Sequence, residues 1–109
     1  MIGLATAIVV ADDLLMRARL ESAAASAGFD VAARAVAAQP DEPPAIVLAD
    51  LDGPRTLDTV RSLLERFDAL RVVGFCSHVD RERWQAAESI GVEVHPRGAS
   101  TKAEDIIRA

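Results

Sequence analysis

The sequence predicts an α/β domain with a doubly wound, five-stranded parallel sheet in the strand order 2-1-3-4-5 and a shortened second helix. Apolar runs of strand length alternate with segments of helical character along the 109 residues, which is typical of a parallel sheet with helices on both faces. Right-handed crossovers narrow the topology to this order. The length fits a single domain over residues 1–109.

Composition restricts the classes of partner. The net charge of −5 argues against binding to nucleic acid or to an anionic membrane surface, since both need basic patches. The sequence contains no apolar run of about 18 residues, so we expect no membrane-spanning helix. Cys76 is the single cysteine, which excludes an internal disulfide and a multi-cysteine metal site, and we expect a reducing, cytoplasmic environment.

The first strand and helix are delimited by carboxylates and a glycine. Residues 4–11 are rich in β-branched side chains and predict the first strand. Either Asp12 or Asp13 is expected to cap a helix over residues 14–27, and Gly28 is expected to end it. The buried stripe of this helix is expected to carry Leu15, Ala18 or Arg19, Ala23 and Ala27.

The second strand and the second helix are predicted to be short. Residues 29–33 predict an edge strand, and residues 34–44 end in a proline-rich stretch. Because a parallel crossover takes about a dozen residues, only about one or two helical turns fit there.

The third strand, residues 46–49, is a continuous apolar run, as expected for a strand buried on both faces. It ends at Asp50, and Asp52 and a Gly-Pro turn follow. Ligands of open α/β sheets bind at the carboxyl ends of the strands, so Asp50 lies where chemistry is expected. Pro54 is predicted to occupy the first turn of an amphipathic helix that carries apolar residues from Leu57 to Phe67.

Residues 71–76 predict the fourth strand. Ser77 and Asp80 have the spacing of a capping box for a helix that reaches Ile90 and ends at Gly91.

Residues 92–95 predict a short fifth strand. Thr101 and Glu104 repeat the capping-box spacing before a brief last helix, in which Ile106 and Ile107 are expected to face inward.

Parallel strands end at the same edge of a sheet, so this order brings three polar pairs together. These pairs are Asp12 with Asp13, Asp50 with Asp52, and Cys76 with Ser77. Beside a cation from the fifth strand, such a group suits phosphoryl transfer. The carboxylates bind Mg²⁺, one of them attacks, and the hydroxyl and the cation bind the transferred oxygens.

Two tracts of the chain have the spacing of a known domain. One is Val-Val-Ala-Asp-Asp at residues 9–13, followed by a helix and Ala-Gly-Phe-Asp-Val at residues 27–31. The other is residues 72–78, with a helix that ends at Gly91. Over nearly its whole length the chain resembles the receiver domain of two-component response regulators, and this implies a flavodoxin-like (CheY-like) fold.

The resemblance implies a role for each residue at the sheet edge. Asp50 matches the phospho-accepting aspartate, and Asp12 matches an acidic residue that helps to bind Mg²⁺. The main-chain carbonyl of Asp52 matches a further metal ligand, so the implied Mg²⁺ site consists of Asp12, Asp50 and Asp52. Ser77 and Arg97 are the implied phosphate contacts.

The chain departs from the receiver pattern around this site. Ala11 stands where the family has a first acid, and Val94 replaces its usual aromatic residue. Cys76 stands at the family's Ser/Thr position and is expected to be a small core residue rather than a nucleophile. A His-Pro-Arg sequence replaces the family's Lys-Pro, so Arg97 or His95 has to supply the cation. We therefore predict a degenerate, pseudo-receiver-like domain.

These patterns predict a stand-alone signalling module of a phosphorelay rather than an enzyme. It would act by binding a protein, either a histidine kinase or a downstream effector, with Mg²⁺-dependent phosphorylation of Asp50. Trp84 and His95 are the candidate partner contacts, since Trp is enriched at the centres of interfaces. The alternating charges at residues 80–83 are expected to form a solvated helix face, and a short last helix would favour a homodimer.

The Asp-Leu-Asp-Gly sequence at residues 50–53 also resembles the first motif of haloacid-dehalogenase-type phosphatases. That resemblance implies a small Mg²⁺-dependent phosphohydrolase, in which Asp50 is the nucleophile and Asp52 the acid/base. The family places its motif on the first strand and follows it with a long chain, whereas here a β-α-β unit precedes the motif. Four residues are a weak motif, and we keep this function as the alternative.

Overall fold

The structure, a computed structural model, describes residues 4–33, 36–37 and 39–109. Its elements in chain order are β1 (Thr6–Val10), α1 (Leu14–Ser26), β2 (Asp30–Val31), β3 (Ile46–Asp50), α3 (Thr56–Arg66), β4 (Val72–Cys76), α4 (Arg81–Ser89), β5 (Glu93–Pro96), the 3₁₀ segment η1 (Arg97–Lys102) and α5 (Ala103–Arg108). All strand pairs are parallel, in the order β2-β1-β3-β4-β5. The predicted doubly wound, flavodoxin-like sheet is therefore confirmed.

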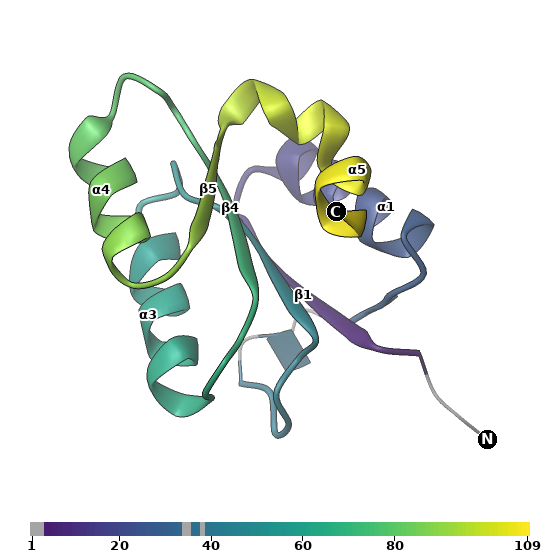
Figure 1. Cartoon of the computed structure of the whole chain (residues 1–109). Coiled ribbons are helices and arrows are strands. Elements are labelled where there is room, and N and C mark those ends of the chain that lie inside the picture. The colour runs from purple at the N-terminus through teal and green to yellow at the C-terminus, as the bar shows by residue number, and fades with distance from the viewer. Residues whose placement is uncertain (1–3, 34–35, 38) are drawn as a thin grey trace.

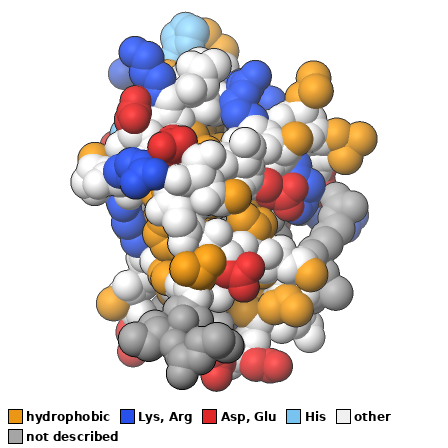
Figure 2. All heavy atoms as spheres, turned by 90° about the vertical axis from the view of Figure 1, so that its right-hand side faces the viewer, with side chains coloured by type: hydrophobic (Ala, Val, Ile, Leu, Met, Phe, Trp, Pro, Cys, Tyr) orange, Lys and Arg blue, Asp and Glu red, His pale blue; other side chains and the backbone are white. Residues whose placement is uncertain are grey.

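Helices cover both faces of the sheet, with α1 and α5 on one side and α3 and α4 on the other (Figure 1). Side chains alternate between the two layers, so Ala7 and Val9 of β1 join the α1–α5 core while Ile8 joins the α3–α4 core. All residues of β3 are buried, as its continuous apolar run predicted. Apolar and charged side chains are interspersed on the surface that carries α1 and α5 (Figure 2).

The predicted strands are all present, with adjusted ends. β1 and β2 are shorter than residues 4–11 and 29–33, and β5 begins and ends one residue later than predicted. The predicted second helix falls on a segment in which residues 34, 35 and 38 lie outside the described part of the chain. Within the part that the structure describes, no helix has the length and apolar character needed to cross a membrane.

Helix α1 is capped as predicted but buries a different stripe. Asp13 is the N-cap residue, and its Oδ1 accepts a hydrogen bond from the backbone N–H of Met16 at 2.9 Å. Gly28 adopts a φ of 93°, which lets the chain leave the helix in the left-handed conformation. The buried residues are Met16, Leu20 and Ala24. The expectation that Leu15 is buried is wrong, because it is 81% exposed.

Helices α3 and α4 begin later than the sequence suggested. Pro54 lies in the turn before α3, which starts at Thr56, so the placement of Pro54 in the first helical turn is wrong. Asp80, and not Ser77, is the N-cap of α4, and its Oδ1 accepts from the backbone N–H of Arg83 at 3.1 Å. Gly91 ends α4 with a φ of 94°, as predicted.

The last helix is entered through η1 rather than through a capping box. The hydroxyl of Thr101 donates to the carbonyl of Gly98 at 3.1 Å, so the predicted capping role of Thr101 is wrong. Ile107 is buried in the α1–α5 core, and Ile106 packs against that core. Arg71 donates to the carbonyls of Ile107 and Ile106 at 2.8 and 3.0 Å, which ties α5 to the sheet.

Candidate functional site

Asp50 ends β3 at the carboxyl edge of the sheet, and its side chain is 3% exposed. In the sheet register Asp50 lies beside Phe75 of β4, and Phe75 lies beside His95 of β5. Two strand spacings, about 10 Å, therefore separate His95 from Asp50. Arg97 follows the end of β5, and its longer side chain reaches back to Asp50.

Arg97 is the centre of a group of ion pairs that we call the Arg97 cluster, formed with Asp13, Asp50 and Asp52. Its Nη1 donates to Asp50 Oδ1 at 2.6 Å and to Asp52 Oδ2 at 3.0 Å. Its Nη2 lies 3.7 Å from Asp13 Oδ2. Burial lowers the pKa of Arg97, but hydrogen bonding to Asp50 and the charge of Asp50, followed by those of Asp52, outweigh this and raise it above its ordinary value. The guanidinium stays charged at neutral pH.

Backbone N–H groups add to the contacts of the two carboxylates. Asp50 Oδ1 also accepts from the backbone N–H of Asp52 at 3.2 Å. Asp52 Oδ1 accepts from the backbone N–H of Ser77 at 2.9 Å, which links the ends of β3 and β4. Ser77 thus contributes its main chain to the site, and the role of its hydroxyl as a phosphate contact stays a prediction.

Asp12 and Asp13, the two acids after β1, lie in different surroundings. Asp13 caps α1 with one oxygen and approaches Arg97 with the other. Asp12 is exposed and borders a hollow that Arg17 and Thr59 also line. Asp12 was predicted to bind the metal, whereas it is Asp13 that lies beside Arg97. The capping pattern was the only feature of the sequence that could have indicated this position, because an N-cap residue holds its side chain at the start of the helix.

The resemblance implies a Mg²⁺ ion at Asp12, Asp50 and Asp52, and the residues do not fit that ion in this arrangement. Mg²⁺ needs near-octahedral oxygen ligands at about 2.0–2.1 Å. Among residues 4–33, 36–37 and 39–109, no three carboxylate, imidazole or thiol side chains are grouped closely enough to hold a metal ion. Between the oxygens of Asp50 and Asp52 lies the guanidinium of Arg97. The metal roles of the three aspartates stay predictions.

Cys76 is fully buried at the end of β4. Burial, followed by the charges of Asp52 and Asp80, raises the pKa of its thiol to about 11. The thiol is therefore protonated at neutral pH and is a poor nucleophile and metal ligand. The prediction that Cys76 is a core residue is confirmed.

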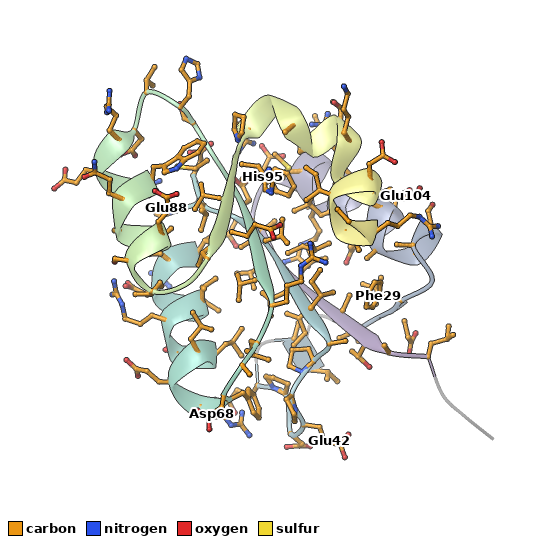
Figure 3. All side chains as sticks on the ribbon, viewed as in Figure 1. Phe29, Glu42, Asp68, Glu88, His95 and Glu104 are labelled. Carbon is orange, nitrogen blue, oxygen red and sulfur yellow. The ribbon has the colours of Figure 1, made fainter. Side chains whose placement is uncertain are left out.

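His95 belongs to the sheet rather than to the Arg97 cluster. Its Nε2 lies 3.2 Å from Glu93 Oε2, and its ring centroid lies 6.0 Å from that of Phe75. Figure 3 shows His95 projecting from β5 on the side of α5. Of the two residues proposed to supply the cation, Arg97 is the one that contacts Asp50, and the role of His95 as a partner contact stays a prediction.

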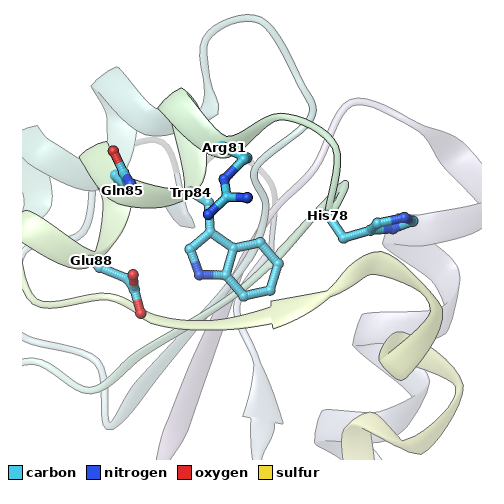
Figure 4. A pocket seen from close by; sticks show the side chains of 5 residues that line it. All are labelled: His78, Arg81, Trp84, Gln85 and Glu88. Carbon is cyan, nitrogen blue, oxygen red and sulfur yellow. The ribbon is translucent and has the colours of Figure 1, made fainter.

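Trp84 is half-buried on α4 and packs against the α3–α4 core. Its indole lies between α4 and β5 and borders an open pocket (Figure 4). The other residues that line this pocket are His78, Arg81, Gln85 and Glu88. Trp84 therefore has both a packing role and a solvent-accessible edge, and its role as a partner contact stays a prediction.

Arg83 contacts the loop after β3, which its sequence position did not predict. Its Nη1 donates to the carbonyl of Leu51, directly after Asp50, at 3.0 Å, and its Nε lies 3.5 Å from Asp80 Oδ2. Residues 80–83 are therefore solvated as expected at Arg81 and Glu82, whereas Asp80 caps α4 and Arg83 contacts Leu51 with side chains that stay 38% and 33% exposed. The charge pattern alone carries no signal for this contact, because it depends on how α4 packs beside the loop after β3.

No family model and no curated protein matches this sequence. Solved structures do match its fold over nearly the whole chain. A response regulator from Thermotoga maritima is 20% identical with a TM-score of 0.68, and the match covers 97% of each chain. The chemotaxis response regulator CheY4 of Vibrio cholerae is 14% identical with a TM-score of 0.67, and the match covers 96% of this chain and 99% of that one.

The chain therefore has the CheY-like fold of response regulators, and the receiver resemblance is confirmed at the level of the fold. The phosphatase alternative is not favoured. Its motif would stand on the first strand, whereas Asp50 and Asp52 follow β3, which lies after a complete β-α-β unit.

Proposed function

We propose that this chain is a receiver-like signalling module. It acts by binding a protein partner, a histidine kinase or a downstream effector of a phosphorelay, and not by turning over a substrate. The observation that carries the proposal is the contact of buried Asp50 with Arg97 at the carboxyl edge of β3, in a fold shared with response regulators. Asp50 stands where the receiver family accepts a phosphoryl group.

The surface proposed to meet the partner is formed by α4 and β5. Trp84 borders an open pocket there, and exposed Arg81 lines the same pocket. Trp and Arg are among the residues most enriched at the energetic centres of protein interfaces. His95 is half-buried on the adjacent strand.

Direct binding tests this proposal. The purified chain is titrated against the phosphotransfer domains of the histidine kinases, and against the effectors, of its own organism. We expect saturable binding to at least one of them, which Arg81→Glu weakens at least about tenfold. Arg61→Glu on α3 is the matched control, because Arg61 is also exposed but lies on a different helix. A chain that binds no member of either set would contradict the proposal.

Phosphorylation of Asp50 is a separate part of the proposal. In this reaction a carboxylate oxygen of Asp50 attacks phosphorus, the bond to the leaving oxygen of acetyl phosphate breaks, acetate departs and an acyl phosphate forms. The test is incubation with acetyl phosphate and Mg²⁺, followed by intact-mass measurement. A gain of one phosphoryl group in the wild type but not in Asp50→Asn establishes the acceptor, and the same gain in both proteins, or no gain in the wild type, removes it.

A further inference from the structure

We infer that Arg97 is a tethered cation that takes the place of a divalent metal ion between Asp50 and Asp52, so that this site assembles without metal and excludes Mg²⁺ while Arg97 is in place. The inference rests on the proposed function, because it states how the same receiver-like site is held. The residues present thereby differ from the metal site that the fold implies.

The position of one nitrogen atom is the first argument. Nη1 of Arg97 donates to Asp50 Oδ1 and to Asp52 Oδ2, at 2.6 and 3.0 Å. A single positively charged group thus bridges one oxygen from each carboxylate, as a bridging metal ion would. Asp50 is 3% exposed, so its carboxylate has little water to replace that contact.

Charge repulsion is the second argument. Two carboxylates whose oxygens both lie within hydrogen-bond distance of one nitrogen atom repel each other unless that nitrogen belongs to a cation. The guanidinium supplies that charge permanently, since arginine does not lose its proton in proteins. A divalent ion that approached the same oxygens would meet this positive charge at close range, which raises the free energy of its binding.

The attachment of Arg97 to the fold is the third argument. Arg97 opens η1 directly after β5, and Ser100 of η1 is buried and accepts a hydrogen bond from Arg19 of α1 at 2.8 Å. A cation anchored in this way binds intramolecularly, so its occupancy of the site does not depend on the concentration of free Mg²⁺. Tethering therefore favours the arginine over the ion.

Removal of the guanidinium should uncover a cation site. Asp50 and Asp52 both contact Nη1 of Arg97, so in Arg97→Ala these two carboxylates face the space that it vacates. Carboxylate oxygens are the ligands that Mg²⁺ and Mn²⁺ prefer, and water completes their coordination.

The experiment is a Mn²⁺ titration of the isolated chain, followed by the electron paramagnetic resonance signal of free Mn²⁺, with Mg²⁺ as competitor. We expect Arg97→Ala to bind one Mn²⁺ at least about tenfold more tightly than the wild type. The double variant Arg97→Ala/Asp50→Asn should lose this gain. Arg61→Gln, which removes an arginine charge from the exposed surface of α3, should behave as the wild type.

A wild type that binds Mn²⁺ as tightly as Arg97→Ala would overturn the inference, as would an Arg97→Ala variant that folds without gaining a site. If Arg97→Ala and Arg97→Met are unfolded in metal-free buffer, recovery of their circular dichroism on addition of Mg²⁺ supports the inference and failure to recover overturns it. These outcomes are independent of partner binding, so the inference and the proposed function fail separately.

Discussion

Asp50 is a carboxylate buried at the end of the most central strand, and its burial has to be compensated by local charge and hydrogen bonds. Desolvation of an ionised group costs several kcal/mol unless a partner repays it. Arg97 and the backbone N–H of Asp52 are the partners that share its Oδ1. The stability of the chain should therefore depend on Arg97 more than on arginines at the surface.

Arg97→Ala should lower the free energy of unfolding by about 1–3 kcal/mol in metal-free buffer. The loss comes from leaving the Asp50 carboxylate without its cation, and it is smaller than for a fully buried pair because Arg97 is 37% exposed. Urea denaturation measures the change. Arg61→Ala should change it by less than about 0.5 kcal/mol, since its pair with Asp58 is exposed. Equal losses in the two variants would contradict this account.

Cys76 should resist alkylation in the folded chain. Its pKa of about 11, against an ordinary 9.0, reduces its thiolate fraction about a hundredfold at pH 8. Iodoacetamide should modify the native protein far more slowly than the protein in urea, and the mass change reports on this thiol alone because it is the single cysteine. The thiol of Cys76 keeps its proton to a higher pH in the folded chain than in the unfolded chain. The free energy of unfolding should therefore fall as the pH rises from 9.0 to about 11. Rapid modification of the native thiol at pH 8 would refute the first expectation.

Helix starts illustrate how elements depend on context. Both Ser77 and Asp80 are good cap residues, and sequence spacing favoured Ser77 through its capping-box pattern. The chain uses Asp80, and the backbone N–H of Ser77, which a capping box would pair with Asp80, donates instead to Asp52 at the end of β3. The contact that decides the cap is therefore a tertiary one.

Asp80→Ala should destabilise the chain by about 1 kcal/mol, the usual cost of losing an N-cap. Its pairing with Arg83, which also contacts the carbonyl of Leu51, should add to this loss. Ser77→Ala keeps the backbone N–H and should change stability by less than about 0.5 kcal/mol. Thermal unfolding of both variants checks the order, and a greater loss in Ser77→Ala would assign the cap to Ser77.

The entry to the last helix was mispredicted for a related reason. The spacing of Thr101 and Glu104 fits a capping box. Ser100, the residue before Thr101, is however buried and accepts a hydrogen bond from Arg19. The chain therefore tightens into η1 over residues 97–102. The first residue of η1 is Arg97, which contacts Asp50, so the conformation of η1 and the geometry of the Arg97 cluster are coupled.

At the scale of the whole molecule, α3 and α4 on one face and α1 and α5 on the other enclose the sheet (Figure 1). The last helix has only the residues Ala103–Arg108, and Val79 before α4 is 76% exposed. We expect so brief a last helix to cover the surface formed by α4, β5 and α5 only in part, which would favour association with a second copy or a partner.

The chain should therefore form a weak homodimer whose population grows with concentration. Sedimentation equilibrium checks this, and Arg81→Glu should shift the equilibrium towards monomer while Arg61→Glu leaves it unchanged. A protein that remains monomeric at high concentration would count against a dimer through this surface.

The sequence by itself determined the order of strands and helices, the buried run of β3 and the position of Asp50 at its end. These features follow from short-range periodicity, turn residues and the handedness of crossovers. The tertiary structure alone decided that Leu15 faces solvent, that Asp13 rather than Asp12 approaches the site, and that Arg97 rather than His95 contacts Asp50. Those choices depend on strand register and side-chain reach across neighbouring elements, and these distances are set only when the sheet and its helices pack.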